Sequence, residues 1–213
     1  MNFIADDRSP AATADLDALM RRYEQKDIVV GVIGLGYVGL PLALTAAMSG
    51  FRTLGFDIDP TKTEAITGRR SYLRHIPDAA IATACATGRF EATTNFAALA
   101  DADAILVCVP TPLTKNRDPD LVFVESTTRT IATYLRKNQL VALESTTWPG
   151  TTVEVMRPIL DATGLSCGAD YFLAFSPERE DPGNADFTTR TIAKVVGADD
   201  DASRALALAL YRG

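Results

Sequence analysis

The sequence predicts an α/β protein with a doubly wound, mainly parallel sheet and helices on both faces. Two observations predict it. Short apolar, β-branched runs alternate with longer segments in which apolar residues recur at helical spacing, a pattern typical of parallel sheets. In addition, the first run leads into the glycine-rich turn Gly34-Leu35-Gly36-Tyr37-Val38-Gly39, and the second ends in Asp57. Together these features indicate a Rossmann-type fold, and 213 residues suffice for one large domain.

The first third of the chain predicts a helix followed by a βαβα unit. We expect a disordered start, a helix packed beside the sheet, and then strands and helices punctuated by Gly50 and by the capping pair Asp59-Pro60. The expected elements are a disordered segment over residues 1–14, a helix over 15–25, a strand over 27–33, a helix over 40–49, a strand over 52–57 and a helix from 59.

The rest of the chain continues the alternation of strands and helices. A hydroxyl-rich turn at 144–152 leads into a helix, in which several threonines are possible N-caps. The other expected elements are strands over 104–109, 139–143, 171–175 and 192–196, a helix over 119–136, and a helix from residue 200 to the end.

Composition excludes several classes of partner. A formal net charge of −6 argues against nucleic acid, and no apolar run approaches the roughly 20 residues of a membrane span. The N-terminus is acidic and polar where a signal peptide is basic and then apolar, so we expect a cytoplasmic protein. The three cysteines Cys85, Cys108 and Cys167 are widely spaced, which predicts neither disulfides nor zinc. With His75 the single histidine, we expect no metal site.

The glycine turn carries the first functional hypothesis, since it follows a predicted strand and opens a predicted helix. In that position the backbone N–H groups of Tyr37, Val38 and Gly39 face a pyrophosphate, with the positive end of the helix dipole behind them. Gly36 allows the phosphates to approach the backbone closely. The turn therefore predicts dinucleotide binding.

Asp57 indicates which dinucleotide is bound. It ends the second strand about 20 residues after the turn, where a carboxylate accepts both hydroxyls of the adenosine ribose. A 2′-phosphate would be repelled there and no arginine follows immediately, so NAD is favoured over NADP. The alternative, a purely local role in turn and cap, fits Asp59 well and Asp57 poorly.

Three later loops also follow predicted strands, where ligands of open α/β sheets bind. They are Pro110-Thr111-Pro112-Leu113, the segment 144–152, and the charged segment 176–183. Each has an ordinary alternative, because prolines end strands, hydroxyl residues cap helices and charged loops are solvated. Their shared position at strand ends favours a common functional site.

The segments GVIGLGYVGLPLA, GFDIDPTK, CVPTPL, ESTTWPGTT and SPEREDPGN together resemble the UDP-glucose/GDP-mannose dehydrogenase family. The last two are most similar to its UDP-N-acetylglucosamine 6-dehydrogenase and UDP-N-acetylmannosamine dehydrogenase branches. The resemblance runs from about residue 15 to the end of the chain. It implies an enzyme that oxidises the C6 alcohol of a nucleotide sugar to a carboxylate, passing two hydrides in succession to two NAD molecules.

The resemblance also implies a role for each matching residue. Thr146 would help to position the catalytic water, and Glu178 would be the general base or water activator. Arg179 would face the substrate diphosphate or acetamido group, unless it forms a surface ion pair with Glu180 or Asp181. The implied cofactor contacts are Gly34, Gly36, Tyr37, Val38 and Gly39 at the pyrophosphate, Asp57 and Lys62 at the adenosine ribose, Thr111 at the nicotinamide side, and Thr146.

Two departures from the family pattern limit what the resemblance implies. Pro182 stands where many relatives have a second carboxylate. We expect four features of the family beyond residue 213: its nucleophilic cysteine, its lysine, its asparagine and its UDP-binding domain. None of the three cysteines of this chain matches the nucleophile's motif, so a packing role is the better interpretation of these cysteines.

We therefore expect residues 15–205 to be an NAD-binding domain and 206–213 to begin the central helix that usually forms the homodimer. Such a chain would bind NAD, with most of a UDP-sugar site absent, and would not complete turnover alone. The alternatives are a free-standing NAD-binding regulatory module and a relative of the 6-phosphogluconate or 3-hydroxyacid dehydrogenases.

Overall fold

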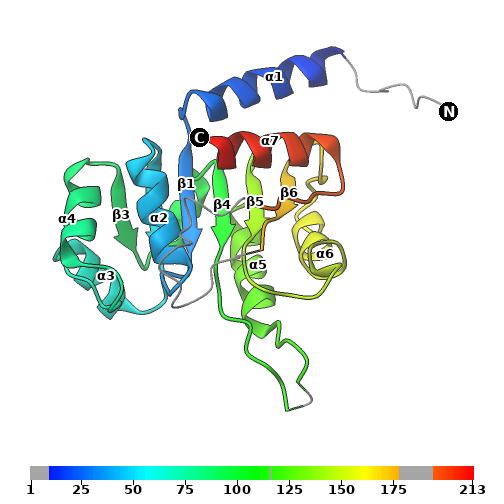
Figure 1. Cartoon of the computed structure of the whole chain (residues 1–213). Helices are drawn as coiled ribbons and strands as arrows, with labels where there is room; N and C mark the ends of the chain where they lie inside the picture. Colours follow the sequence, from blue (N-terminus) through cyan, green and yellow to red (C-terminus); the bar gives the residue numbers. More distant parts are fainter. Residues whose placement is uncertain (1–9, 116, 178–193) are drawn as a thin grey trace.

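The computed structural model describes residues 10–115, 117–177 and 194–213. The strands within these ranges form one six-stranded sheet, in which every pair of neighbouring strands is parallel (Figure 1). The strand order is β3-β2-β1-β4-β5-β6, the doubly wound order that the sequence predicts. The strands are β1 (Val29–Ile33), β2 (Arg52–Phe56), β3 (Phe90–Thr93), β4 (Ala104–Val107), β5 (Leu140–Leu143) and β6 (Phe172–Phe175).

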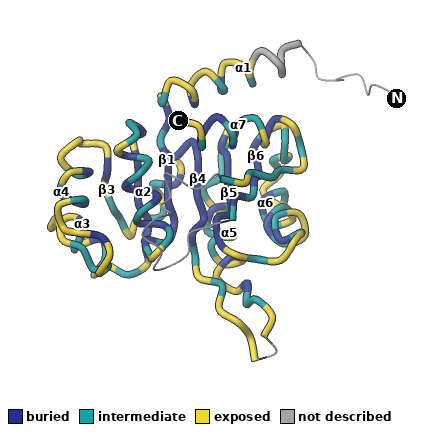
Figure 2. Tube along the Cα trace, in the orientation of Figure 1, coloured by how far each residue is buried: buried dark blue, intermediate teal, exposed yellow. Residues whose placement is uncertain are grey.

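Helices cover both faces of the sheet, which gives the molecule two apolar cores. One core contains residues of α2, α4 and α7, and the other contains residues of η1, α5 and α6. Figure 2 shows the strands between them as largely buried, apart from the edge strand β3. The helices are α1 (Pro10–Glu24), α2 (Gly39–Met48), α3 (Pro60–Thr67), α4 (Asp78–Ala86), the 3₁₀ helix η1 (Phe96–Asp101), α5 (Val122–Tyr134), the π-helical turn η2 (Thr152–Met156), α6 (Arg157–Asp161) and α7 (Asp201–Arg212).

The central strands are apolar throughout because both of their faces are covered. Every residue of β4 and β5 is buried, as expected for a parallel sheet between two helix layers. Burying one leucine such as Leu140 contributes roughly 1.5–3 kcal/mol to stability. This packing fixes the carboxyl ends of the strands, and hence the loops that follow them.

The N-terminal helix begins earlier than predicted. We expect disorder through residue 14, but α1 starts at Pro10. Proline is favoured in a first helical turn, and the alanines that follow have the highest helix propensity. Residues 1–9 lie outside the described part of the chain. The helix packs against α7 near the amino ends of the strands (Figure 1), with Leu19 and Tyr23 buried.

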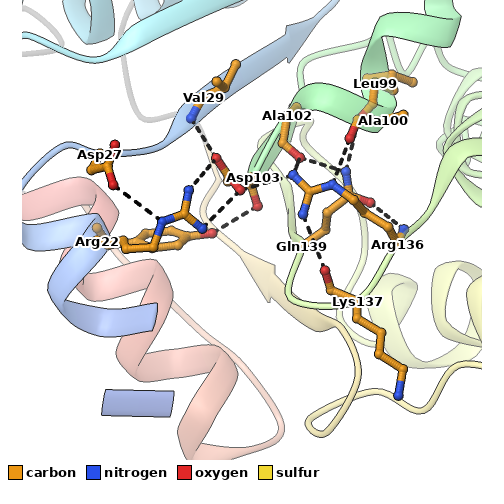
Figure 3. A network of polar contacts seen from close by, with 11 residues as sticks. Arg22, Asp27, Val29, Leu99, Ala100, Ala102, Asp103, Arg136, Lys137 and Gln139 are labelled. Carbon is orange, nitrogen blue, oxygen red and sulfur yellow. Dashed lines mark hydrogen bonds and ion pairs between the residues drawn. The ribbon is translucent and has the colours of Figure 1, made fainter. Parts of the chain in front are cut away.

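A polar network joins α1 to the amino edge of the sheet (Figure 3). Asp103, just before β4, accepts hydrogen bonds from the Arg22 guanidinium at 3.3 and 3.4 Å and from the backbone N–H of Val29 at 2.9 Å. Arg136 donates to the same carboxylate at 3.0 Å, and Tyr23 donates to the Asp103 carbonyl at 2.9 Å. These contacts lie at the edge of the sheet opposite its carboxyl ends.

Three elements of the structure, α4, β3 and η1, are not among those predicted from the sequence. Of the four residues of β3, only Phe90 is buried, so no alternation marks it as a strand. In α4 only Ile81 and Ala84 are buried, which leaves little helical periodicity in an alanine-rich segment. Both elements lie at the β3 edge of the sheet, where one layer of packing suffices.

Two predicted strands also differ from the structure. The strand expected over 104–109 ends at Val107. Of the strand expected over 192–196, residues 194–196 are not in a strand and the first two lie outside the described residues; Phe175 instead forms an isolated antiparallel bridge with Gly197. The domain boundary expected after residue 205 stays a prediction; residues 206–212 belong to α7, whose Leu206 and Leu210 pack in the core.

The helix expected after 144–152 begins as a π-helical turn. The N–H of Arg157 bonds the carbonyl of Thr152, five residues back. Pro158 has no N–H to donate to residue 154, and its ring crowds that carbonyl, so a wider turn precedes it.

Candidate functional site

A cavity of about 730 Å³ opens at the carboxyl edge of the sheet. This volume lies in the range of small-molecule and cofactor sites. Its walls come from the glycine turn after β1, the end of β2, the loops after β4 and β5, and one side of α5. Since β1 and β4 are neighbours while their helices lie on opposite faces, the cavity sits at the point where the strand order reverses.

Each glycine of the turn is required for a different reason. Gly34 has a φ of +90°, and a Cβ there would lie 2.6 Å from the carbonyl oxygen of Cys108. A Cβ on Gly39 would lie 1.9 Å from the carbonyl oxygen of Gly34, which excludes any side chain. A Cβ on Gly36 would meet nothing within 4 Å, so this glycine faces open space and leaves room for a ligand beside the backbone.

The start of α2 presents unpaired backbone donors to the cavity. No side chain caps the helix at Val38. Among the described residues, none accepts a hydrogen bond from the backbone N–H of Tyr37, Val38 or Gly39. Tyr37 and Val38 also line the cavity, and the Tyr37 ring lies against His75 with centroids 4.5 Å apart. This arrangement suits an anion, as the sequence predicts.

Asp57 joins the glycine turn to the end of β2. Its side chain is 5% exposed. One carboxylate oxygen accepts from the backbone N–H of Leu35 at 2.8 Å and from Lys62 Nζ at 2.9 Å; the other accepts from the N–H of Asp59 at 3.0 Å. Asp57 therefore has a local role, which corrects the expectation that such a role fits it poorly. A carboxylate offers about four acceptor positions, so capacity remains for a ribose hydroxyl.

Asp59 has the local role that the sequence indicates. It caps α3 by accepting from the backbone N–H of Thr61 at 2.9 Å. Hydrogen bonds from the Thr61 side chain and backbone hold the pKa of Asp59 below its ordinary value. The exposed side chain of Ile58, between the two aspartates, forms part of the cavity wall.

The loops after β4 and β5 are bonded to each other. Thr111 donates its hydroxyl to the carbonyl of Thr146 at 2.7 Å, and both residues line the cavity. Ser145 donates to the carbonyl of Val109 at 2.6 Å. Thr111, predicted for the nicotinamide side, and Thr146, predicted to position the catalytic water, are thus adjacent although 35 residues separate them in the sequence.

The sequence analysis did not identify the wall that α5 contributes. Phe123, Ser126, Thr127 and Thr130 line the cavity, whereas the core-facing residues of the same helix, such as Val124, are buried. The lining residues recur at i, i+3, i+4 and i+7, one stripe of a helix. This stripe of mostly small polar residues beside an apolar one is the signal that could have revealed them.

The catalytic loop of the hypothesis lies outside the described residues. Glu178, Arg179, Glu180, Asp181 and Pro182 all belong to the part of the chain that the structure does not describe. Their roles stay predictions.

The cysteines show no sign of activation. Cys108 directly follows β4 and is buried, and burial raises the pKa of both Cys85 and Cys167. An activated thiol has a lowered pKa, so packing accounts better for these residues. Within the ranges that the structure describes, no group of three histidine, cysteine or acidic side chains is placed to hold a metal, and no helix is long and apolar enough to cross a membrane.

Comparisons with known proteins show what the chain is similar to. The sequence profile described as "UDP-glucose/GDP-mannose dehydrogenase family, NAD binding domain" matches residues 28–213. The chain is 34% identical over 187 residues to the UDP-N-acetyl-D-mannosamine dehydrogenase of Pyrococcus horikoshii, covering 86% of this chain and 44% of that protein. It is 35% identical over 193 residues to the UDP-N-acetyl-D-glucosamine 6-dehydrogenase of Pseudomonas aeruginosa, covering 88% and 44%.

The fold of the chain is also similar to that of a solved dehydrogenase structure. The chain matches the crystal structure of the NDP-N-acetyl-D-galactosaminuronic acid dehydrogenase of Methanosarcina mazei with a TM-score of 0.83 and 32% identity, covering 92% of this chain and 44% of that one. The chain thus spans less than half the length of the relatives it matches.

Proposed function

The chain belongs to the UDP-glucose/GDP-mannose dehydrogenase family, whose NAD-binding domain it contains, and we propose that it supplies the cofactor half of an enzyme that oxidises the C6 alcohol of a nucleotide sugar. The observation that carries the proposal is that the glycine turn, Asp57 and the loops after β4 and β5 line one cavity. Family membership sets aside the 6-phosphogluconate and 3-hydroxyacid dehydrogenase alternatives.

In this proposal NAD, when bound, supplies the hydride acceptor, and the residues of the chain position it. The N–H groups of Tyr37, Val38 and Gly39 bind the pyrophosphate, and Gly36 leaves room for it. Asp57 accepts from the adenosine ribose, while Lys62 holds its carboxylate in place at 2.9 Å. A 2′-phosphate would meet the Asp57 charge, so NADP is disfavoured.

The loops after β4 and β5 hold the reacting end in this proposal. Thr111 and Thr146 lie at the nicotinamide side, and Thr146 helps to position the water that hydrolyses the enzyme-bound intermediate. Glu178 is the general base or water activator, and Arg179 faces the substrate. Most of the nucleotide-sugar site and the nucleophilic cysteine belong to the remainder of the full-length protein, which we propose is a homodimer.

A cytoplasmic location also belongs to this proposal. It is supported by the three cysteines, none of which is paired in a disulfide. Fractionation of cells that express the full-length protein, with a cytoplasmic marker enzyme followed in parallel, tests it; recovery in a membrane or secreted fraction would contradict it.

The activity is tested by assaying the full-length protein with NAD and a panel of UDP-N-acetylglucosamine, UDP-N-acetylmannosamine, UDP-glucose and GDP-mannose. We expect one of these sugars to yield two NADH per molecule, because the alcohol is oxidised to the carboxylate. Absence of NADH with all four would contradict the proposal. The 213-residue chain should bind NAD without sustained turnover; if it turns over alone, the assignment of the nucleophile to another part of the protein is wrong.

A further inference from the structure

Three polar residues meet beside the core at the carboxyl end of β5, one of them buried and two of them half-buried. Glu144 is fully buried, and its carboxylate pairs with Lys194 Nζ at 2.7 Å. The hydroxyl of Tyr211, near the end of α7, donates to the other oxygen of the same carboxylate. The Lys194 ammonium also lies 5.5 Å from the centre of the Tyr211 ring. We call Glu144, Lys194 and Tyr211 the Glu144 clamp.

Burying the charged groups of the Glu144 clamp is unfavourable in free energy, which a group with only a packing role would not require. Taking a carboxylate fully out of water and an ammonium mostly out of it is unfavourable, and apolar residues of the same volume are often as stabilising. Burial and the nearby Glu144 raise the pKa of Tyr211 well above its ordinary value, so its hydroxyl remains a donor at neutral pH. Neither the buried ion pair nor the hydrogen bond from Tyr211 is needed to hold α7, which already packs through Leu206 and Leu210.

Position connects the clamp to the cofactor cavity. Glu144 lines the cavity and directly precedes Ser145 and Thr146. That loop is fixed to the β4 side by Ser145, which donates to Val109, and by Thr111, which donates to Thr146. The clamp fixes it on the α7 side. The β5 loop therefore depends on two independent sets of contacts.

The sheet order says which half of the dinucleotide this loop meets. In the order β3-β2-β1-β4-β5-β6, the first mononucleotide half lies over β1 and β2 and the second over β4 and β5. We propose that Glu144, held by Lys194 and Tyr211, is a positioning residue that fixes the β5 loop for the nicotinamide half of NAD. This inference rests on the proposed placement of the cofactor.

Calorimetry with two ligands separates positioning from folding, because ADP occupies only the half that the clamp does not touch. For Glu144→Gln, Lys194→Met and Tyr211→Phe in the 213-residue chain, we expect NAD affinity to fall about tenfold while ADP affinity stays within about twofold. Lys194→Arg, which keeps the charge, should restore most of the NAD affinity. Lys137→Met is the matched control, since Lys137 pairs with Asp170 on the surface.

The outcomes are distinguishable. If all three variants bind NAD as the parent does, or lose NAD and ADP affinity equally, the positioning role is wrong. If the parent binds ADP and NAD with equal affinity, the β5 loop contributes nothing to nicotinamide binding and the inference also fails. If the parent binds neither, the cofactor assignment itself fails and takes the inference with it. Tyr211→Phe removes one hydroxyl and keeps the ion pair, so it remains informative should Glu144→Gln not fold.

Discussion

At the scale of single residues, the glycines of the turn illustrate what adding one methyl group can do. A methyl group on Gly36 would border open space, whereas one on Gly39 would overlap the carbonyl oxygen of Gly34. An added methyl group should therefore affect ligand binding at Gly36 and the stability of the fold at Gly39.

Gly36→Ala should leave the free energy of unfolding within about 1 kcal/mol of the parent, because the new methyl group meets no protein atom. Its NAD affinity should fall about tenfold or more, because the methyl group occupies the space of the pyrophosphate. Gly39→Ala should instead lose about 3 kcal/mol of stability or more, because its methyl group overlaps a backbone carbonyl and the backbone must shift. Urea unfolding and calorimetry on both variants check this; an unchanged NAD affinity in Gly36→Ala would contradict the placement of the pyrophosphate.

Single residues also mark the limit of sequence reasoning. The position of Asp57 could be predicted, because the end of β2 is defined by the spacing from the turn. Its contacts could not, since the bond from the Leu35 N–H depends on how closely the β1 turn approaches β2. Likewise the bond between Thr111 and Thr146 joins two loops whose conformations no local pattern specifies.

At the scale of elements, α1 is fixed to the sheet through Asp103, at the edge remote from the cavity. The network joins α1, β1, β4 and the segment after α5 (Figure 3). It should therefore affect stability and leave cofactor binding unchanged.

Asp103→Asn should lower the free energy of unfolding by roughly 1–3 kcal/mol, because charged hydrogen bonds to two arginines and one backbone N–H are weakened. NAD affinity should not change. Arg204→Met, which breaks an exposed pair with Asp201, is the control and should cost less than about 1 kcal/mol. Urea unfolding and NAD titration measure both quantities; lost NAD affinity without lost stability would refute the separation of the two edges.

Helices and strands could be predicted where burial imposes a pattern of apolar residues, and could not be predicted where it does not. Strands β4 and β5 are buried on both faces and read as continuous apolar runs. The edge strand β3 and helix α4 bury too few residues to leave such a trace. The π-helical turn η2 arises from Pro158 acting on a helix that the sequence predicts only as a helix.

At the scale of the whole molecule, the sheet topology assembles the site. Tyr37, Asp57, Thr111 and Thr146 follow four different strands, and parallel strands bring their carboxyl ends to one edge. This convergence could be predicted from the order of motifs alone. The wall formed by α5 is marked in the sequence only by the stripe of small polar residues beside Phe123, and the order of motifs alone does not place it.

Stability as a function of pH reports on the whole core. Burial raises the pKa of Tyr23, Tyr72, Tyr171 and Tyr211 above the ordinary value. Above about pH 10 the unfolded chain loses tyrosine protons that the folded chain keeps, so the free energy of unfolding should fall by about 1.4 kcal/mol per pH unit for each such tyrosine. Below that pH these groups contribute no slope.

Urea unfolding from pH 8 to 11 measures this slope, and Tyr23→Phe should reduce it by about 1.4 kcal/mol per pH unit above pH 10. A slope that is unchanged in this variant would show that Tyr23 ionises equally in both states.

The most direct test of the central claim is a calorimetric titration of the 213-residue chain with NAD and with NADP, repeated on Asp57→Ala. The account predicts micromolar to millimolar binding of NAD, weaker binding of NADP, and NAD affinity reduced about tenfold or more in the variant. Equal affinity for the two dinucleotides, absence of NAD binding, or an unchanged NAD affinity in Asp57→Ala would contradict it.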